Sequence, residues 1–122
     1  MSTRPPFSAE MTDGDHATAQ IWSLSGKMMG GSCCYDFLET VRDNIRKGQN
    51  QPILDLTKVS LANSTGLGVL ASIFTAAKDA GGMMHLVSVN DRVQSVLKVI
   101  NLWYVVSPCD SVEEALAKID QG

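Results

Sequence analysis

The chain has 122 residues, 44% of them hydrophobic, and a formal net charge of −3. This length fits one domain that can bury a core without disulfides or metals. The acidic balance argues against a nucleic-acid partner, which would require a basic surface. The first residues lack the apolar run of a signal peptide, so we expect none, and the longest uncharged apolar stretch, 66–77, is far shorter than the ~20 residues of a membrane span. We therefore expect a cytoplasmic protein that does not insert into membranes.

The cysteines and histidines do not form a recognisable site. Cys33, Cys34 and Cys109 are odd in number and include an adjacent pair, which is not a disulfide framework. His16 and His85 lack the spacing to complete a metal cluster with them. We expect the cysteines to be small buried side chains in a reducing compartment, and we expect neither a metal nor a cofactor.

The N-terminal part is predicted to be a flexible segment, 1–6, followed by a single domain over 7–120. Two strands are expected, over 7–12 and 17–24. The residues between them, Asp13-Gly14-Asp15-His16, have the chemistry of a hairpin turn, because Asp-Gly favours positive backbone dihedrals. The domain should therefore begin with an antiparallel hairpin.

A first helix is predicted after a glycine-rich connection. Its apolar stripe at helical spacing is Cys34, Leu38, Val41 and Ile45. Ser32 is expected to cap its start, and Gly48 to end it in the left-handed conformation. The connection itself, 26–32, matches no phosphate-binding pattern, so we expect a plain loop.

The next segment combines a short strand, a polar turn and a second helix. The apolar run 53–56 predicts the strand, with Asp55 as a turn former at its end. A helix is expected over 64–80, and from Ser64 to Ala77 it carries no charged residue. A helix that is neutral on nearly all sides is either buried or a binding surface. We expect this one to contact a partner or a second copy of the chain.

The C-terminal part continues the alternation, with strands predicted over 84–89 and 103–106. The helix between them is expected to be capped by Asn90 and stopped by Asn101. Its apolar stripe is Val93, Val96, Leu97 and Ile100.

A last helix is predicted to open with a capping box from Ser111 to Glu114. Its apolar stripe is Val112, Ala115, Leu116 and Ile119. Alternating strands and helices favour parallel neighbours in a sheet. We therefore predict a small α/β domain with a mixed, mostly parallel sheet of about five strands, an antiparallel N-terminal hairpin and about four helices.

Ser64 stands where a helix is predicted to begin after the polar turn. The first N–H groups of a helix lack intrahelical partners, so Asn63, Ser64 or Thr65 should cap it. The same place tolerates a phosphate, because a helix N-terminus favours anions. Gly66 and Gly68 are unfavourable inside a helix and indicate close approach of another backbone, the sheet in one case.

These residues carry a resemblance to a known family. Leu54-Asp55-Leu56 at the end of a strand and Asn63-Ser64-Thr65-Gly66-Leu67-Gly68 opening a helix resemble the signature of STAS domains. The segments 81–89 and 91–97 are similar to the strand and helix that follow in this family, and the likeness extends over 7–119. The family is named for sulfate transporters and anti-sigma factor antagonists.

The resemblance implies a non-enzymatic anti-sigma factor antagonist. Its partner would be an anti-sigma factor with serine/threonine kinase activity, which binds ATP and Mg²⁺ itself. Ser64 corresponds to the serine that such a kinase phosphorylates, and Asn63 stands where the family usually has Asp. The residues implied for partner binding are Asn63, Ser64, Thr65, Gly66, Leu67 and Leu70.

Two other interpretations stay open at this point. The chain could be a constitutive interaction module, in a stressosome-like signalling assembly or beside a membrane transporter, with Ser64 serving only as a cap. An acyl-transfer enzyme is disfavoured, because Ala62 replaces the first glycine of a nucleophile elbow and only His85 follows Ser64 as a base. The oligomeric state, including a homo-oligomer, is left open.

Overall fold

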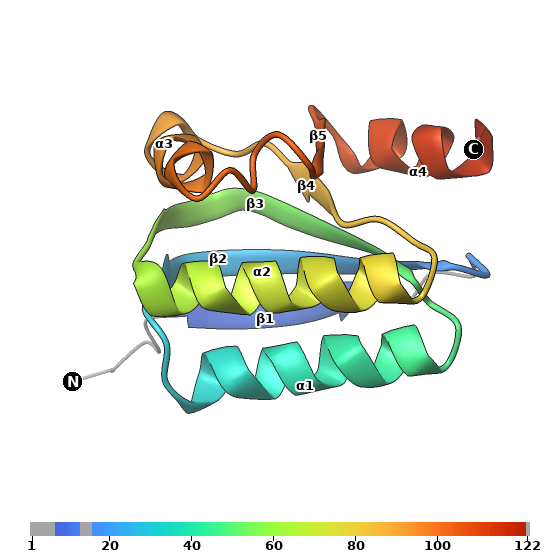
Figure 1. Ribbon diagram of the computed structural model, residues 1–122, viewed down its shortest axis with the longest axis horizontal. Coiled ribbons are helices and arrows are strands. Elements are labelled where there is room, and N and C mark those ends of the chain that lie inside the picture. The colour runs from blue at the N-terminus through green and yellow to red at the C-terminus, as the bar shows by residue number, and fades with distance from the viewer. Residues whose placement is uncertain (1–6, 13–15, 122) are drawn as a thin grey trace.

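The computed structural model describes residues 7–12 and 16–121, and Figure 1 shows the arrangement of the chain. The elements are β1 (Phe7–Thr12), β2 (Ala19–Met28), α1 (Ser32–Arg46), β3 (Gln51–Ala62), α2 (Ser64–Asp79), β4 (His85–Val87), α3 (Asp91–Val99), β5 (Ser107–Cys109) and α4 (Val112–Gln121). The strands form one five-stranded sheet in the order β1-β2-β3-β4-β5. β1 is antiparallel to β2, and every other pair is parallel. The predicted fold class and the N-terminal hairpin are confirmed, while Asp13, Gly14 and Asp15 of the predicted turn lie outside the described residues.

Two hydrophobic clusters lie on opposite faces of this sheet. Successive residues of β3 divide between them: Leu54 belongs to the larger cluster and Ile53 to the smaller. Helices α1, α2 and α3 all contribute to the larger cluster, whereas α4 contributes Ala115 to the smaller one. This division follows from topology, because α1, α2 and α3 each connect one strand to the next in the same direction, and right-handed crossovers then place them on one face.

β3 is much longer than the sequence predicted. It runs for 12 residues to Ala62, instead of ending at Leu56. The Asp55 side chain accepts hydrogen bonds from the backbone N–H and the hydroxyl of Thr57, but these bonds mark an irregularity in the pairing with β2, where the register shifts after Ser23. A β-bulge absorbs an extra residue and lets a strand continue. The prediction that Asp55 ends the strand is therefore wrong.

The region between α3 and α4 also departs from the sequence prediction. Residues 103–105 form a turn, because the N–H groups of Val105 and Val106 both donate to the Leu102 carbonyl. The last strand is β5, further along the chain. The turn buries Leu102 and Val106 but leaves Tyr104 exposed, and Ile100, predicted to face the core, is 44% exposed.

The helix ends follow the predictions in part. Asn90 caps α3 by accepting from the Val93 N–H at 2.9 Å. Asn101 and Gly48 have positive φ angles of 62° and 109°, as expected for left-handed stops. Ser32 does not cap α1: the residue before the helix is Gly31, with φ of 89° and no side-chain hydrogen bond.

The start of α4 is capped as predicted, with one change. The Glu114 N–H donates to the Ser111 hydroxyl at 3.1 Å, but the Glu114 carboxylate accepts from the Asp110 N–H instead of returning to Ser111. Val112, Leu116 and Ile119 pack around Ala115 as the stripe predicted.

The cysteines are free, and two of the three follow the prediction. Cys34 and Cys109 are buried, whereas Cys33 is exposed because it precedes the buried stripe of α1 by one position. Within the described residues, no helix is both long and apolar enough to cross a membrane, and no three His, Cys, Asp or Glu side chains gather as metal ligands.

The first turn of α2 lies directly against the end of β2. A Cβ atom added to Gly66 would lie 2.0 Å from the Met28 carbonyl oxygen, whereas one added to Gly68 would meet no atom within 4 Å. The prediction that the sheet requires one of the two glycines is confirmed, and the residue is Gly66.

This contact generates a paired prediction. Gly66→Ala should lower the free energy of unfolding by about 3 kcal/mol or more, because backbone must move to admit the methyl group. Gly68→Ala should raise it by about 1 kcal/mol, because Ala is the better helix former in open space. Urea denaturation of both variants measures the difference, and equal effects would contradict the close contact.

Candidate functional site

Ser64 lies exposed at the first position of α2, beside the ends of two strands. Met28 and Ala62, the last residues of β2 and β3, are paired in register. The Asn63 N–H donates to the Met28 carbonyl at 3.1 Å. The chain therefore leaves the sheet and enters α2 within a single residue, Asn63, and Ser64 follows at the edge of the sheet.

The Asn63 side chain uses both of its ends. Its Oδ1 accepts from the Gly66 N–H at 2.9 Å, and its Nδ2 donates to the Met29 carbonyl at 3.1 Å. The Asn63 carbonyl also accepts from the Leu67 N–H at 2.8 Å. Of the three capping candidates, Asn63 is the cap, so the Ser64 hydroxyl is not required for that purpose.

The loop before α1 forms the second wall of this site, which the sequence did not predict. Gly30 and Gly31 have positive φ angles, and a Cβ atom on Gly30 would lie 2.7 Å from the Thr65 Cγ2. Met29 is 44% exposed beside Asn63, whereas Met28 is fully buried. The glycine pair was the available signal, because it permits the tight approach of this loop to α2.

The residues predicted to bind a partner divide by exposure. Ser64 and Thr65 are exposed and Asn63 is half-buried. The other three are buried: Gly66, Leu67 and Leu70, the last completely. They face the sheet and pack α2 against it. The surface available to another molecule is therefore the outer row of α2, which continues from Ser64 through Gly68, Ser72 and Thr75.

This surface is electrically neutral. α2 has no acidic residue in its first turn, and Lys78 is the basic residue of its last turn. The first turn of α1, which begins at the same end of the molecule (Figure 1), also has no acidic residue. Two helix N-termini, each carrying partial positive charge, thus lie near Ser64 without carboxylates in their first turns.

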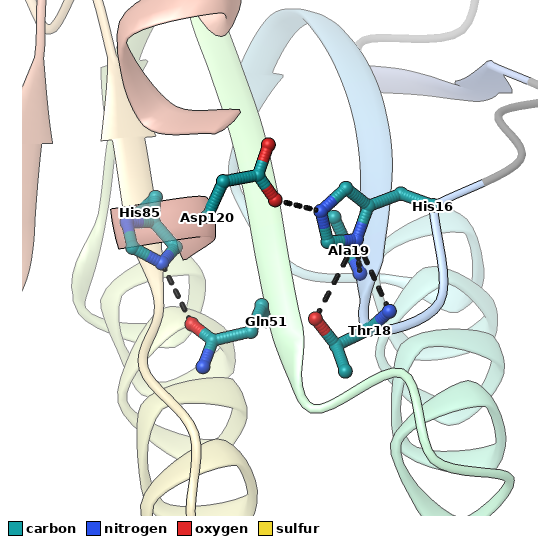
Figure 2. A network of polar contacts seen from close by, with 6 residues as sticks. All are labelled: His16, Thr18, Ala19, Gln51, His85 and Asp120. Atoms are coloured by element: carbon teal, nitrogen blue, oxygen red, sulfur yellow. Dashed lines mark hydrogen bonds and ion pairs between the residues drawn. The ribbon is translucent and has the colours of Figure 1, made fainter. Parts of the chain in front are cut away.

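Both histidines lie at the opposite end of the sheet. The His16 Nε2 lies 2.7 Å from an Asp120 carboxylate oxygen, and its Nδ1 accepts from the N–H groups of Thr18 and Ala19, each at 3.1 Å (Figure 2). His85 is paired with Ile53, nine positions before Ala62, which is about 30 Å along an extended strand. Neither imidazole is placed to activate the Ser64 hydroxyl.

His85 is buried, with only 5% of its surface exposed. Its Nε2 lies 2.8 Å from the Gln51 Oε1, and a neutral ring that donates to this oxygen carries its proton on Nε2. The buried Nδ1 has no hydrogen-bond partner within the part of the chain described. Burial, and secondly the positive charge of Lys118, lower the pKa of His85 from 6.5 to about 4.

Comparison with known proteins places this geometry in a family. The family model described as STAS domain matches residues 21–115. A Thermotoga maritima protein named "Putative anti-sigma factor antagonist" is 35% identical over 75 residues, which are 62% of this chain and 66% of that protein. Its homolog in Thermotoga neapolitana is 37% identical over the same shares of each chain. The match thus spans slightly less than two thirds of these relatives' length.

Solved structures agree with this assignment. The crystal structure of a Thermotoga maritima protein described as a "putative anti-sigma factor antagonist" has a TM-score of 0.76 at 29% identity, covering 91% of this chain and 93% of that one. The anti-sigma factor antagonist SpoIIAA in its unphosphorylated form has a TM-score of 0.80 at 15% identity, covering 94% and 98%. SpoIIAA from Bacillus in its phosphorylated form has a TM-score of 0.67 at 14% identity, covering 92% and 99%. At these identities the SpoIIAA structures show a shared fold only.

The chain belongs to the STAS domain family. The family model covers most of the sheet together with α1, α2 and α3, and it includes the Asn63–Ser64 junction. The resemblance found in the sequence is therefore confirmed at the level of the family, and relatives within it are anti-sigma factor antagonists by name.

The double use of the Asn63 side chain predicts the effect of placing an acidic residue at this position. In Asn63→Asp an anionic oxygen would face the Met29 carbonyl where the amide now donates, so the free energy of unfolding at pH 7 should fall by about 1–2 kcal/mol. Asn63→Ser should lower the free energy of unfolding by less, because serine keeps a capping oxygen and places no charge beside the Met29 carbonyl. Thermal and urea unfolding compare the three proteins, and a more stable Asn63→Asp would contradict this account.

His85 predicts a dependence of stability on pH. The pKa of His85 is about 4 in the folded protein, below its ordinary value of 6.5, so the unfolded chain binds more protons between these two pH values. The folded protein keeps His85 neutral, so the free energy of unfolding should fall as the pH drops from 6.5 toward 4. The total decrease from this residue should be about 3 kcal/mol. Unfolding of wild type and His85→Gln between pH 7 and 4 measures it, and parallel curves for the two proteins would overturn the assignment.

Proposed function

We propose that this protein is a non-enzymatic, cytoplasmic anti-sigma factor antagonist that binds an anti-sigma factor with serine kinase activity. Phosphorylation of Ser64 by that kinase ends the interaction, and the unphosphorylated form releases a sigma factor. Membership of the STAS family and the names of the Thermotoga relatives support the class of function. The existence of SpoIIAA structures in both unphosphorylated and phosphorylated forms supports the type of switch.

The observation that carries the proposal is the position of Ser64. Its side chain is exposed at the start of α2, while the neighbouring Asn63 supplies the cap. A kinase can therefore reach the hydroxyl without unfolding the helix. A structural serine would more naturally occupy the capping position itself.

Phosphorylation would change the surface without destroying the fold. A phosphate adds about −1.5 to −2 charges at pH 7, and the N–H groups at the start of α2 tolerate that anion. The outer row of α2 carries only Gly68, Ser72 and Thr75 as far as Asp79. A partner packed on this neutral row would have to desolvate the phosphate, which weakens binding.

Asn63 supports recognition of the unphosphorylated form. Its amide holds the 29–31 loop against α2, so Met29 and Ser64 are presented together. Because the Asn63 side chain is neutral, a cationic side chain of the partner cannot form an ion pair with it. We therefore propose that hydrogen bonding and shape, more than charge, determine the contact at this residue.

The test compares wild type, Ser64→Ala and Ser64→Asp in capture experiments from a lysate of the source organism, followed by titration of the purified partner. Wild type and Ser64→Ala should bind an anti-sigma factor kinase, and Ser64→Asp should bind at least about tenfold more weakly, the equivalent of about 1.4 kcal/mol. With ATP and Mg²⁺ the kinase should phosphorylate wild type at Ser64, read by mass spectrometry.

Ser95→Asp is the matched control, because Ser95 is also an exposed hydroxyl residue on a helix, but on α3 and outside the outer row of α2. It should bind the partner as wild type does. Equal capture by wild type and Ser64→Asp, with Ser64 unmodified, would instead identify a constitutive module of a signalling assembly or a transporter-associated subunit.

A further inference from the structure

A groove lies between the second halves of α1 and α2, on the outer side of the helix pair. It has a volume of about 660 Å³ and is lined on the α1 side by Arg42, Ile45 and Arg46. Figure 1 shows the two helices side by side and running in the same direction. The groove is therefore bounded by two parallel helices.

The α2 wall is hollow because its side chains are small. Between Ala71 and Ala80 the lining residues include Ser72, Thr75 and Ala76, none of which is larger than threonine. This stretch of α2 is about 14 Å long at 1.5 Å per residue. A helix of two to three turns has that length, and an amphipathic helix is a common occupant of such grooves.

The groove is continuous with the proposed contact at Ser64. Ser64, Gly68, Ser72 and Thr75 are separated by four, four and three positions, so they form one row along α2. All four are exposed. A partner that packs on Ser64 and extends along this row reaches the groove without crossing any charged side chain of α2.

The positive charges on the α1 side of the groove favour an acidic side chain from a bound partner. Arg42 and Arg46 stand on the α1 rim, and their ion pairs are with Glu39 and Asp43 one turn earlier. These ion pairs are exposed and add little to the stability of the fold. The guanidinium groups can therefore turn toward a partner carboxylate with little loss of free energy. Asp79 is the acidic residue of the opposite wall, and it lies at the far end.

We propose that the groove between α1 and α2 receives a helix of two to three turns from the anti-sigma factor, with an acidic side chain directed at Arg42 and Arg46. This inference rests on the proposed function, because it extends the same contact surface from Ser64 along α2. Ser64 then controls one end of the interface, and the groove supplies affinity at the other end.

The test uses the purified full-length chain and the purified anti-sigma factor kinase that wild type binds. Thr75→Tyr fills the groove, and Ser95→Tyr is its control, because both hydroxyls are exposed and donate to the carbonyl four residues earlier. Arg42→Glu reverses the rim charge, and Arg92→Glu on α3 is its control. Calorimetric titration should show binding weakened about tenfold or more by Thr75→Tyr and Arg42→Glu, and unchanged by both controls.

A photo-cross-linking residue in place of Ser72 provides a second measurement that does not depend on a bulky or charge-reversed variant. It should attach to a helical segment of the anti-sigma factor that contains Asp or Glu. Attachment to a second copy of this chain would overturn the inference and make the groove a surface for self-association.

The two proposals fail in different ways. If Ser64→Asp loses binding while Thr75→Tyr and Arg42→Glu bind as wild type does, the groove is not used and the proposed function stands. If wild type binds no anti-sigma factor, the proposed function fails and the inference fails with it.

Discussion

The contact between the first turn of α2 and the end of β2 determines the shape of the candidate site. Gly66 lies so close to the Met28 carbonyl that no side chain fits between them. Because α2 begins directly at the sheet, Asn63 can bond to Met28, Met29 and Gly66 at once. Ser64 is then the first residue that points away from all of this packing, and its exposure follows from the same contact.

α2 divides its residues between two tasks. Its inner side, including Leu67, Leu70 and Ile73, fills the larger hydrophobic cluster between the helix and the sheet. Its outer row carries small neutral side chains, which do nothing for the core. Burying a charge between this surface and a partner is unfavourable. A single phosphate at the start of the row should therefore weaken partner binding strongly. Both histidines lie at the other end of the sheet, so neither imidazole is placed to activate the Ser64 hydroxyl.

Several details could be predicted from local sequence because local chemistry decides them. Asn90 and Ser111 are caps, and Gly48 and Asn101 adopt left-handed conformations, since each depends on a few neighbouring residues. The length of β3 could not be predicted, because its continuation past Asp55 depends on pairing with β2 across a bulge. Residues 103–106 have the composition of a strand, but the burial of Leu102 and Val106 requires a turn there. The burial of His85, which is only 5% exposed, is likewise a result of tertiary packing that its neighbours in sequence do not reveal.

The sequence by itself determined the alternation of strands and helices, the STAS resemblance and the place of Ser64 at a helix start. These features rest on periodicity, capping chemistry and a short motif, all of which are local. The tertiary structure alone decided which capping candidate acts, which glycine touches the sheet and which predicted contact residues are buried. It also created the groove beside Arg42 and Arg46, because such a surface exists only when α1 and α2, which a strand separates in the sequence, pack side by side.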